Sequence, residues 1–300
     1  MNLIRTSIKL LALAIAVGFA TPALAQVPIR DYRRAHERQI LDEFTRLLAI
    51  PNIASDHENI RRNAQFILEM MQRRGLNPQL LEGRTNDTPP AVYGEWKAPG
   101  AVPTIVLYAH YDGQPVDPKQ WTASLPFQPT WRSAAMESGG QIVTLPATGE
   151  INPEWRIYAR AASDDKAGVM AILTALDAVR AQGIAPSLNI KFIFEGEEEA
   201  GSPHLGEIID LHKDLLAADA WIICDGPVHQ SGRKQVVFGV RGDQNVDSHG
   251  LWREAAVAQR ALRQLGAKPG DAFGAAARLD ERRRGTSYDR RLVRRRRTAG

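Results

Sequence analysis

Four short segments, each at or near the end of an apolar run, carry the side chains that could do chemistry. In chain order they are Thr104–Gly113, Arg156–Gly168, Ile190–Ser202 and Trp221–Pro227. An apolar run that ends in histidine or carboxylates is how a parallel sheet delivers ligands to its carboxyl edge. Mixed histidine and carboxylate ligands suit zinc or a similar divalent ion. Together the segments indicate a metal-dependent hydrolase.

The first two segments offer a histidine and three aspartates. His110 and Asp112 form an H-x-D, and residues two apart on an extended chain share a face, so Asp112 could orient the imidazole. The alternative is a surface turn. Asp164 and Asp165 stand between a strand-like segment and a helix, where N-capping is the competing interpretation.

The last two segments are more strongly acidic. Glu197, Glu198 and Glu199 follow a buried strand, with Glu195 just before them. Four carboxylates in five residues repel one another unless a cation is present, although a solvated acidic turn is the alternative. Asp225 ends a further apolar run, and the Gly-Pro after it also fits a turn-capping role.

The elements that must position these side chains follow from periodicity. Helical spacing predicts helices over Asp31–Ala49, Glu58–Arg74, Ala167–Gln182 and Leu205–Leu216. Apolar runs predict strands at Gln79–Leu81, Ala91–Trp96, Thr104–Tyr108, Asn189–Phe194, Ala220–Cys224 and Gln235–Val240, with a long irregular excursion over Asp117–Glu154. Strands separated by helices predict an α/β fold with a mostly parallel sheet sandwiched by helices.

The ordered set H-x-D, D-D-K-x-G, E-G-E-E-E-x-G-S and C-D-G resembles the zinc-dependent exopeptidase and deacylase family. That family includes carnosinase, non-specific dipeptidases, glutamate carboxypeptidase and succinyl-diaminopimelate desuccinylase. The resemblance covers about Arg34 to Asp247. It implies two zinc ions, with Co²⁺ or Mn²⁺ as alternatives, and a small peptide or N-acyl amino acid as substrate.

The resemblance also implies roles for individual residues. His110 and Asp225 would hold one zinc, Asp164 would bridge both, and Glu199 would hold the second. Glu198 would be the catalytic base, and Asp112 would orient His110. Three further acidic residues match no ligand position in the family pattern: Asp165, Glu195 and Glu197.

Two histidines of the family pattern have no counterpart in this chain. One is a fifth ligand near the end of a longer chain, and the other lies in a lid domain that also forms homodimers. His229 and His249 stand in the wrong context to replace them. The resemblance therefore implies a partial catalytic domain over residues 26–242, a lid that starts at residues 243–247, and impaired activity.

The last 53 residues differ from the rest in composition. Ser248–Gly300 holds 13 Arg and one Lys against five acidic residues, a net charge of +9, whereas the first 247 residues carry −5. A reading shifted by one base lets Ala258–Ala272 encode HSGHYGNWAPNPAM, which resembles the family's lid. We therefore expect an out-of-frame, disordered tail, and an intact codon register near Asp247 would contradict this. The alternative is an arm that binds nucleic acid, which export of the chain and the lack of interleaved aromatics disfavour.

The first 25 residues have the pattern of a signal peptide. Arg5 and Lys9 precede the apolar stretch Leu10–Ala20, and Ala23-Leu24-Ala25 is a small-x-small cleavage site. The alternative is a buried N-terminal helix. Cleavage after Ala25 predicts a periplasmic or secreted protein with no membrane span. The single cysteine, Cys224, excludes an intrachain disulfide.

These observations predict a zinc metallopeptidase that cleaves the amide bond of dipeptides or related small peptides. Two alternatives stay open at this point. A deacylase of N-acyl amino acids would share the same metal-binding core, and a non-catalytic binding protein could have kept the fold.

Overall fold

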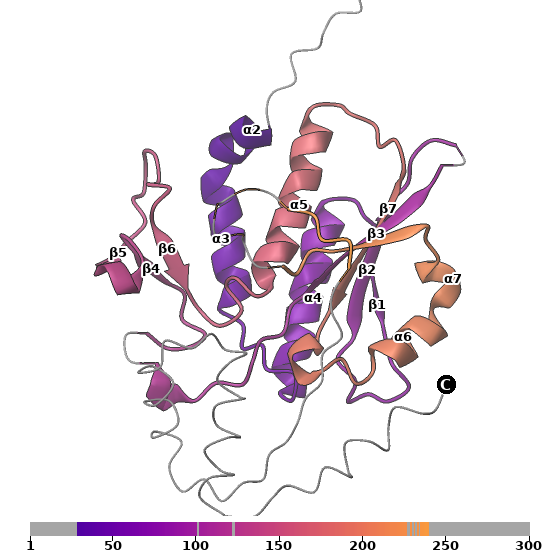
Figure 1. The fold of residues 1–300 in the computed structure, drawn as a ribbon, viewed down its shortest axis with the longest axis horizontal. Helices are drawn as coiled ribbons and strands as arrows, with labels where there is room; N and C mark the ends of the chain where they lie inside the picture. Colours follow the sequence, from indigo (N-terminus) through magenta and orange to yellow (C-terminus); the bar gives the residue numbers. More distant parts are fainter. Residues whose placement is uncertain are drawn as a thin grey trace, which may run out of the picture. The chain divides into compact units, whose positions relative to one another are not determined.

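The structure, a computed structural model, describes residues 29–100, 102–121, 124–226, 229, 231, 233 and 235–239. The chain divides into two compact units, Met1–Arg233 and Lys234–Gly300, which are described separately. Nearly all described residues belong to the first unit (Figure 1). The expected signal peptide and residues 240–300 lie outside the described residues.

Helices form where apolar residues recur at helical spacing, and their ends carry recognisable caps. The Asp56 carboxylate accepts the Asn59 N–H at 3.2 Å, and Asp165 caps the Gly168 N–H in the same way. The helices are α2 (Ile29–Ala35), α3 (Glu37–Leu48), α4 (His57–Arg73), α5 (Lys166–Ala181), α6 (Leu205–Leu211) and α7 (Lys213–Leu216). None of the described helices has the length and apolar character needed to cross a membrane.

The larger sheet has five strands in the order β1-β2-β7-β3-β8. These strands are β1 (Gln79–Leu81), β2 (Ala91–Trp96), β3 (Thr104–His110), β7 (Asn189–Glu195) and β8 (Ala220–Ile223). β3 pairs in parallel with both β7 and β8, while β2 pairs antiparallel with β1 and β7. Four strands therefore point the same way and only β2 opposes them, which confirms the predicted α/β fold with a mostly parallel sheet.

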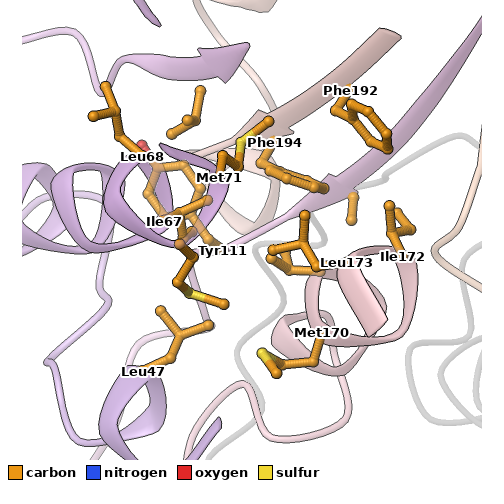
Figure 2. Close-up of a cluster of buried hydrophobic side chains, with 14 of the residues drawn as sticks. Leu47, Ile67, Leu68, Met71, Tyr111, Met170, Ile172, Leu173, Phe192 and Phe194 are labelled. Carbon is orange, nitrogen blue, oxygen red and sulfur yellow. The ribbon is translucent and has the colours of Figure 1, made fainter. Parts of the chain in front are cut away.

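Alternation along the strands assigns each side chain to one of two faces. Phe192 and Phe194 of β7 pack against α3, α4 and α5, together with Leu173 and Met71 (Figure 2). Ile193, between the two phenylalanines, faces the opposite cluster with Ile208 of α6 and Leu216 of α7 as neighbours. Each fully buried large apolar side chain stabilises the fold by about 1.5–3 kcal/mol. Helices thus cover both faces of the sheet.

The segment Asp117–Glu154, expected to be irregular, contributes two strands to a second, smaller sheet. Its strands are β4 (Thr130–Arg132), β5 (Ile142–Val143) and β6 (Arg156–Tyr158), all antiparallel in the order β5-β4-β6. Short 3₁₀ helices at Pro118–Gln120 and Met136–Ser138 complete this region. Strands of two or three residues are too short for a visible alternation of side chains.

Three other expectations about elements need correction. The helix expected over Asp31–Ala49 is interrupted at His36, and the one over Leu205–Leu216 is interrupted at His212. The strand expected over Gln235–Val240 is wrong, because the described residues 235–239 of the second unit adopt no strand. Val236, Val237 and Phe238 are exposed there, and β-branched or aromatic residues form strands only where a partner surface receives them.

Candidate metal centre

Parallel pairing brings three of the four segments to one edge of the larger sheet. His110 is the last residue of β3 and pairs in register with Glu195, the last residue of β7. Glu198 follows β7 in a short 3₁₀ helix, Glu198–Ala200, and Asp225 lies two residues beyond β8. The carboxyl ends of these strands therefore present a histidine and two carboxylates side by side, as the sequence predicted.

The fourth segment reaches this place by another route. Asp164 follows β6, which belongs to the smaller sheet, and lies just before α5. The N-terminus of α5 thus delivers Asp164, where we had expected a strand of the main sheet to do so. The peptide bond between Asp164 and Asp165 is cis.

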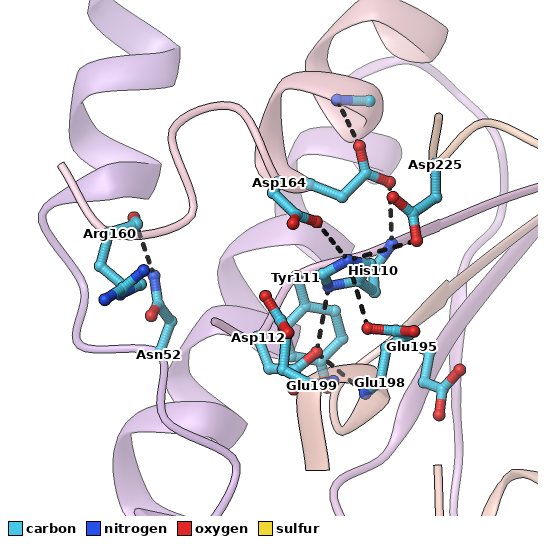
Figure 3. Close-up of polar contacts among 12 residues, drawn as sticks. Asn52, His110, Tyr111, Asp112, Arg160, Asp164, Glu195, Glu198, Glu199 and Asp225 are labelled. Carbon is cyan, nitrogen blue, oxygen red and sulfur yellow. Dashed lines mark hydrogen bonds and ion pairs between the residues drawn. The ribbon is translucent and has the colours of Figure 1, made fainter. Parts of the chain in front are cut away.

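His110 is the centre of the cluster and is fully buried (Figure 3). Its Nε2 lies 3.0 Å from Asp164 Oδ1, 3.6 Å from Asp225 Oδ2 and 3.7 Å from Glu198 Oε2. Three carboxylates on separate segments therefore surround one imidazole nitrogen. The side chain of Asp164 is 63% exposed and that of Glu198 is 38% exposed, so the cluster opens to solvent on this side.

Asp112 lies on the opposite side of the imidazole and is fully buried. Its Oδ1 is 3.2 Å from His110 Nδ1, an ion-pair contact without good hydrogen-bond alignment. The same carboxylate accepts the backbone N–H groups of Glu198 and Glu199 at 3.1 and 3.0 Å. Asp112 therefore lies between the imidazole of His110 and the backbone that carries both glutamates, and an orienting role for it stays a prediction.

The two adjacent aspartates have separate partners. Asp165 is buried, caps the first turn of α5 through Gly168 N–H, and accepts the backbone N–H of His110 at 3.3 Å. Asp164 turns away from the helix toward His110 Nε2. The sequence left capping and cluster formation as alternatives for this pair. In the structure Asp165 caps the helix and Asp164 joins the cluster.

The remaining acidic residues of the Glu-rich segment are also distinct. Glu195 is buried and accepts a hydrogen bond from the hydroxyl of Tyr108. Glu197 is buried and accepts the backbone N–H of His204 at 2.7 Å. Glu199 lies beside Asp112 and Gln114 and is not among the groups within 4 Å of His110 Nε2. Glu195 and Glu197 therefore form hydrogen bonds within the surrounding fold, whereas Glu198 faces the cluster.

The pKa of His110 reflects the excess of negative charge around its imidazole. Burial lowers the pKa of His110, but Asp112, Asp225 and Asp165 outweigh it and raise that pKa to about 10. An imidazole surrounded in this way favours positive charge at its position.

The carboxylates respond in the opposite sense. Burial and the neighbouring Asp225 raise the pKa of Asp165 to about 7, against the effect of His110. Burial also raises the pKa of Glu198, Glu199 and Asp225, and repulsion from neighbouring carboxylates, Asp112 in each case, adds to each rise. A divalent cation among these groups would favour the ionised form of every carboxylate.

The donor set fits a metal ion. Among the described residues, His110, Glu198 and Asp225 each offer one ligand atom, and the three atoms lie within 4.8 Å of one another. One imidazole nitrogen with carboxylate oxygens is a zinc-type ligand set. The structure brings His110, Asp112, Asp164, Glu198 and Asp225 together, and it places Glu199 on the adjoining backbone.

Two buried polar residues near the cluster were missed. The ammonium group of Lys166 is fully buried and donates to the Leu47 carbonyl at 2.9 Å and to Asn63 Oδ1 at 2.6 Å. A lysine in the first turn of a helix is opposed by the helix dipole, and that mismatch could have identified it. Asn52, between two predicted helices, is also fully buried, and no sequence signal distinguishes it from an ordinary turn residue.

Steric crowding explains why two positions of the motifs are glycine. A Cβ on Gly196 would come within 2.3 Å of the Tyr111 hydroxyl oxygen, and a Cβ on Gly168 within 2.3 Å of Asp165 Oδ1. Glycine at each position lets a buried side chain approach the backbone closely. Packing around the cluster thus accounts for the glycine in E-G-E-E-E and the glycine in D-D-K-x-G.

The chain is similar in sequence to several curated dipeptidases. The Cys-Gly metallodipeptidase dug1 of Schizosaccharomyces pombe is 26% identical over 217 residues, which are 67% of this chain and 41% of that protein. The Beta-Ala-His dipeptidase of Homo sapiens is 29% identical over 237 residues (74% and 42%). The Cysteinylglycine-S-conjugate dipeptidase of Corynebacterium striatum is 28% identical over 238 residues (74% and 46%). The chain thus spans less than half the length of the curated relatives it matches.

Solved structures share the fold. The di-peptidase Dug1p from Saccharomyces cerevisiae superposes with a TM-score of 0.54 at 22% identity, over 68% of this chain and 41% of that one. The M20 family metallo-carboxypeptidase Sso-CP2 from Sulfolobus solfataricus gives 0.52 at 31% identity, over 65% and 39%. Human carnosine dipeptidase 1 gives 0.52 at 24% identity, over 66% and 40%.

The family itself is established by a match over more than half of the chain. The profile of Peptidase family M20/M25/M40 matches residues 106–291. That range contains all the residues of the cluster around His110. The chain therefore belongs to Peptidase family M20/M25/M40.

Proposed function

We propose that this chain carries the metal-binding part of a metallopeptidase that hydrolyses the amide bond of dipeptides. The observation that carries the proposal is the convergence of His110, Glu198 and Asp225 at the carboxyl edge of the sheet. Family membership supports a metal-dependent hydrolase, and the names of three similar curated proteins support a dipeptide substrate.

Within this proposal the residues keep the roles that the family resemblance implies. His110 and Asp225 would hold one zinc ion, Asp164 would bridge to a second, and Glu199 would hold the second. A bound zinc ion would polarise the scissile carbonyl and lower the pKa of a water molecule. Two observations support an ordered set: Asp164 lies at hydrogen-bond distance from His110, and Asp112 fixes the backbone of Glu199.

Glu198 would act as the general base and then as the general acid. Its carboxylate would take a proton from the attacking water and return it to the leaving amine. The position of the side chain supports this role, since it is 38% exposed and reaches to 3.7 Å from His110 Nε2. Asp112 would hold its backbone in place throughout, through the N–H of Glu198.

We further propose that the chain of 300 residues has weak activity by itself. The relatives that it matches are more than twice as long as the matched part. The family resemblance places one further ligand and a substrate-binding histidine outside the matched motifs. The proposal is therefore that the metal-binding half is present and that efficient turnover needs the rest of the domain.

A substrate panel tests the proposed function. The chain and a version with the reading frame restored after Asp247 would be loaded with Zn²⁺ and assayed on dipeptides and N-acyl amino acids. We expect metal-dependent dipeptide hydrolysis by the restored protein and at least 100-fold loss in Glu198→Gln, the size of a general-base contribution. Glu154→Gln, at an exposed surface ion pair, is the matched control. Preference for N-acyl amino acids, or turnover that survives Glu198→Gln, would contradict the proposal.

A further inference from the structure

The turn between α3 and α4 touches two of the ligand-bearing segments, although it belongs to none of the four motifs. We propose that Asn52 in this turn is a positioning residue that holds the Asp112 turn and the Asp164 turn at their working separation. The inference rests on the proposed metal-binding function of the cluster. It assigns a role to a residue 58 positions before His110 in the sequence.

The first contact of Asn52 is with the residue that follows Asp112. The backbone carbonyl of Asn52 accepts the N–H of Gly113 at 2.9 Å. A Cβ on Gly113 would come within 2.8 Å of Asn52 Oδ1, so the amide occupies the space that a side chain would otherwise fill. Asn52 thus packs directly on the end of the H-x-D-G turn.

The second contact is with the segment that precedes Asp164. The Asn52 side-chain Nδ2 donates to the carbonyl of Arg160 at 3.3 Å (Figure 3). The Cγ of Arg160 would come within 2.8 Å of a Cβ on Gly113, so these three residues form one packed unit. Asn52 therefore links the backbone beside Asp112, through its own carbonyl, to the backbone four residues before Asp164, through its side-chain amide.

The turn itself is held rigidly. Asn63 of α4 donates to the Pro51 carbonyl at 2.7 Å and accepts the ammonium of Lys166 at 2.6 Å. Lys166 also donates to the carbonyl of Ile50 at 3.4 Å. The residue just after the Asp pair is therefore anchored to the same turn that carries Asn52.

The burial of Asn52 explains why its amide matters. The residue is 0% exposed, its Nδ2 donates to the Arg160 carbonyl, and its Oδ1 has no hydrogen-bond partner among the described residues, so the amide makes one bond that is shielded from water. Groups that orient metal ligands from outside the ligand set commonly change metal affinity by about 10–100-fold when they are replaced. Loss of the amide would remove the side-chain bond to the Arg160 carbonyl and loosen the Asp164 turn against the Asp112 turn, while the backbone bond from Gly113 and the anchors of Lys166 remained.

The test compares Asn52→Ala with Asn189→Ala in the 300-residue chain. Asn189 lies at the amino end of β7, away from the cluster, and its amide also bonds to neighbouring segments, through Ala98 N–H and Thr104 Oγ1. Two readouts apply: Zn²⁺ affinity by titration calorimetry, and amide hydrogen exchange at residues 112–114 and 160–165 without added metal. Asn52→Ser, which keeps a hydroxyl donor, replaces Asn52→Ala if circular dichroism shows loss of fold.

The proposal predicts that Asn52→Ala weakens Zn²⁺ binding about 10-fold and accelerates exchange in both segments. Asn189→Ala should leave both readouts within about twofold of the unchanged chain. Unchanged exchange in the two segments, or faster exchange with unchanged Zn²⁺ affinity, would overturn the positioning role. Absence of Zn²⁺ binding by the unchanged chain would refute the proposed metal site instead, and the exchange readout would still decide whether Asn52 holds the two turns.

Discussion

Acidic residues that are adjacent in this chain do different things in space. Asp165 caps α5 and contacts the backbone of His110, while Asp164 faces the imidazole. Glu197 fixes His204, and Glu198 joins the cluster. Each acidic pair thus combines one carboxylate that stabilises the local backbone with one that faces His110. The backbone role keeps the neighbouring ligand in place.

Gly168 is the residue that this arrangement constrains most directly. We predict that Gly168→Ala destabilises the chain by about 1–3 kcal/mol, because the new Cβ would displace the Asp165 carboxylate from the helix cap. Urea denaturation measures the change. Gly206→Ala is the control, since nothing lies within 4 Å of its new Cβ and alanine favours a helix. A neutral or stabilising Gly168→Ala would contradict the packing described here.

Asp112 is predicted to act on metal affinity through its neighbours. In Asp112→Asn one oxygen becomes an NH₂ group, which cannot accept a backbone N–H, so the bond to Glu198 or the bond to Glu199 is lost. We expect Zn²⁺ affinity to fall about 10–100-fold, measured by titration calorimetry. Asp117→Asn, at the cap of an exposed 3₁₀ helix, serves as the control. Equal affinities for the two variants would argue against an orienting role for Asp112.

The sequence identifies which residue types could bind a metal, but it does not show which way each side chain points. Composition and spacing were sufficient to mark the segments that hold His110, Asp112 and Asp225, which the structure brings together with Asp164 and Glu198. Only the family resemblance singled out Asp164 and Glu198 among their acidic neighbours. Composition and spacing could not separate Asp164 from Asp165, since the backbone geometry of the turn decides which carboxylate faces inward. Nor could they find Asn52, whose importance depends on contacts with residues 61 and 108 positions away.

At the scale of elements, an ionic network joins the three helices on one face of the sheet. Glu43 of α3 accepts from Arg73 of α4 at 2.8 Å and from Arg74, just after α4, at 2.7 Å, and Arg74 also donates to Asp177 of α5 at 2.9 Å. The side chains of Glu43 and Arg74 are about one-tenth exposed, so solvent screens this pair only weakly. The network fixes α5, whose first turn carries the Asp pair, against α3 and α4.

The network predicts a defined pH dependence. Burial raises the pKa of Glu43, but Arg74 and Arg73 outweigh burial and hold that pKa below its usual value. Glu43 therefore stabilises the fold above its unfolded-state pKa, and this contribution is lost as pH falls through its lower folded-state pKa. We expect Glu43→Gln to cost about 2 kcal/mol at pH 7 and much less at pH 3, measured by urea denaturation.

The control for this experiment is Glu154→Gln, because Glu154 pairs with Arg156 at an exposed site and contributes little. Asp177 shares Arg74 with Glu43, and Glu43 contributes to the raised pKa of Asp177, so the pH dependence measured for Glu43→Gln is that of the network. A stability difference for Glu43→Gln that stayed constant between pH 7 and pH 3 would show that its charge is not what ties the helices together.

Elements were predictable where their pattern was long or their ends were marked. The strands Gln79–Leu81 and Ala91–Trp96 have the predicted bounds, and the helix after the Asp pair differs by one residue at each end. Interruptions at His36 and His212 were missed because both helical faces continue across them. The antiparallel direction of β2 was also missed, since alternation along a strand carries no information about its direction.

At the scale of the whole molecule, charge divides the chain unevenly. The net charge is −5 over the first 247 residues and +9 over Ser248–Gly300. The family profile extends to residue 291 and so includes most of the basic segment. The structure describes no residue after 239, so a shifted reading frame beyond Asp247 stays a prediction that sequencing of those codons decides.

Export is a further prediction for the whole molecule. Arg5 and Lys9 before an apolar stretch, with Ala23-Leu24-Ala25 after it, lead us to propose cleavage after Ala25 and a periplasmic or secreted protein. Intact-mass analysis of protein from a bacterial periplasm should give a chain that begins at Gln26. Replacing Ala25 with Phe should block cleavage. A full-length chain that remains in the cytoplasm would refute the signal-peptide interpretation.

A Zn²⁺ titration shows whether the cluster around His110 binds a divalent metal ion. We predict saturable Zn²⁺ binding by the 300-residue chain and at least 10-fold weaker binding by His110→Ala, since His110 Nε2 is the shared centre of the ligand set. His229→Ala should bind like the unchanged chain, because that exposed histidine bonds only to Ser231 among the described residues. No Zn²⁺ binding, or equal binding by His110→Ala, would show that this cluster is not a metal site.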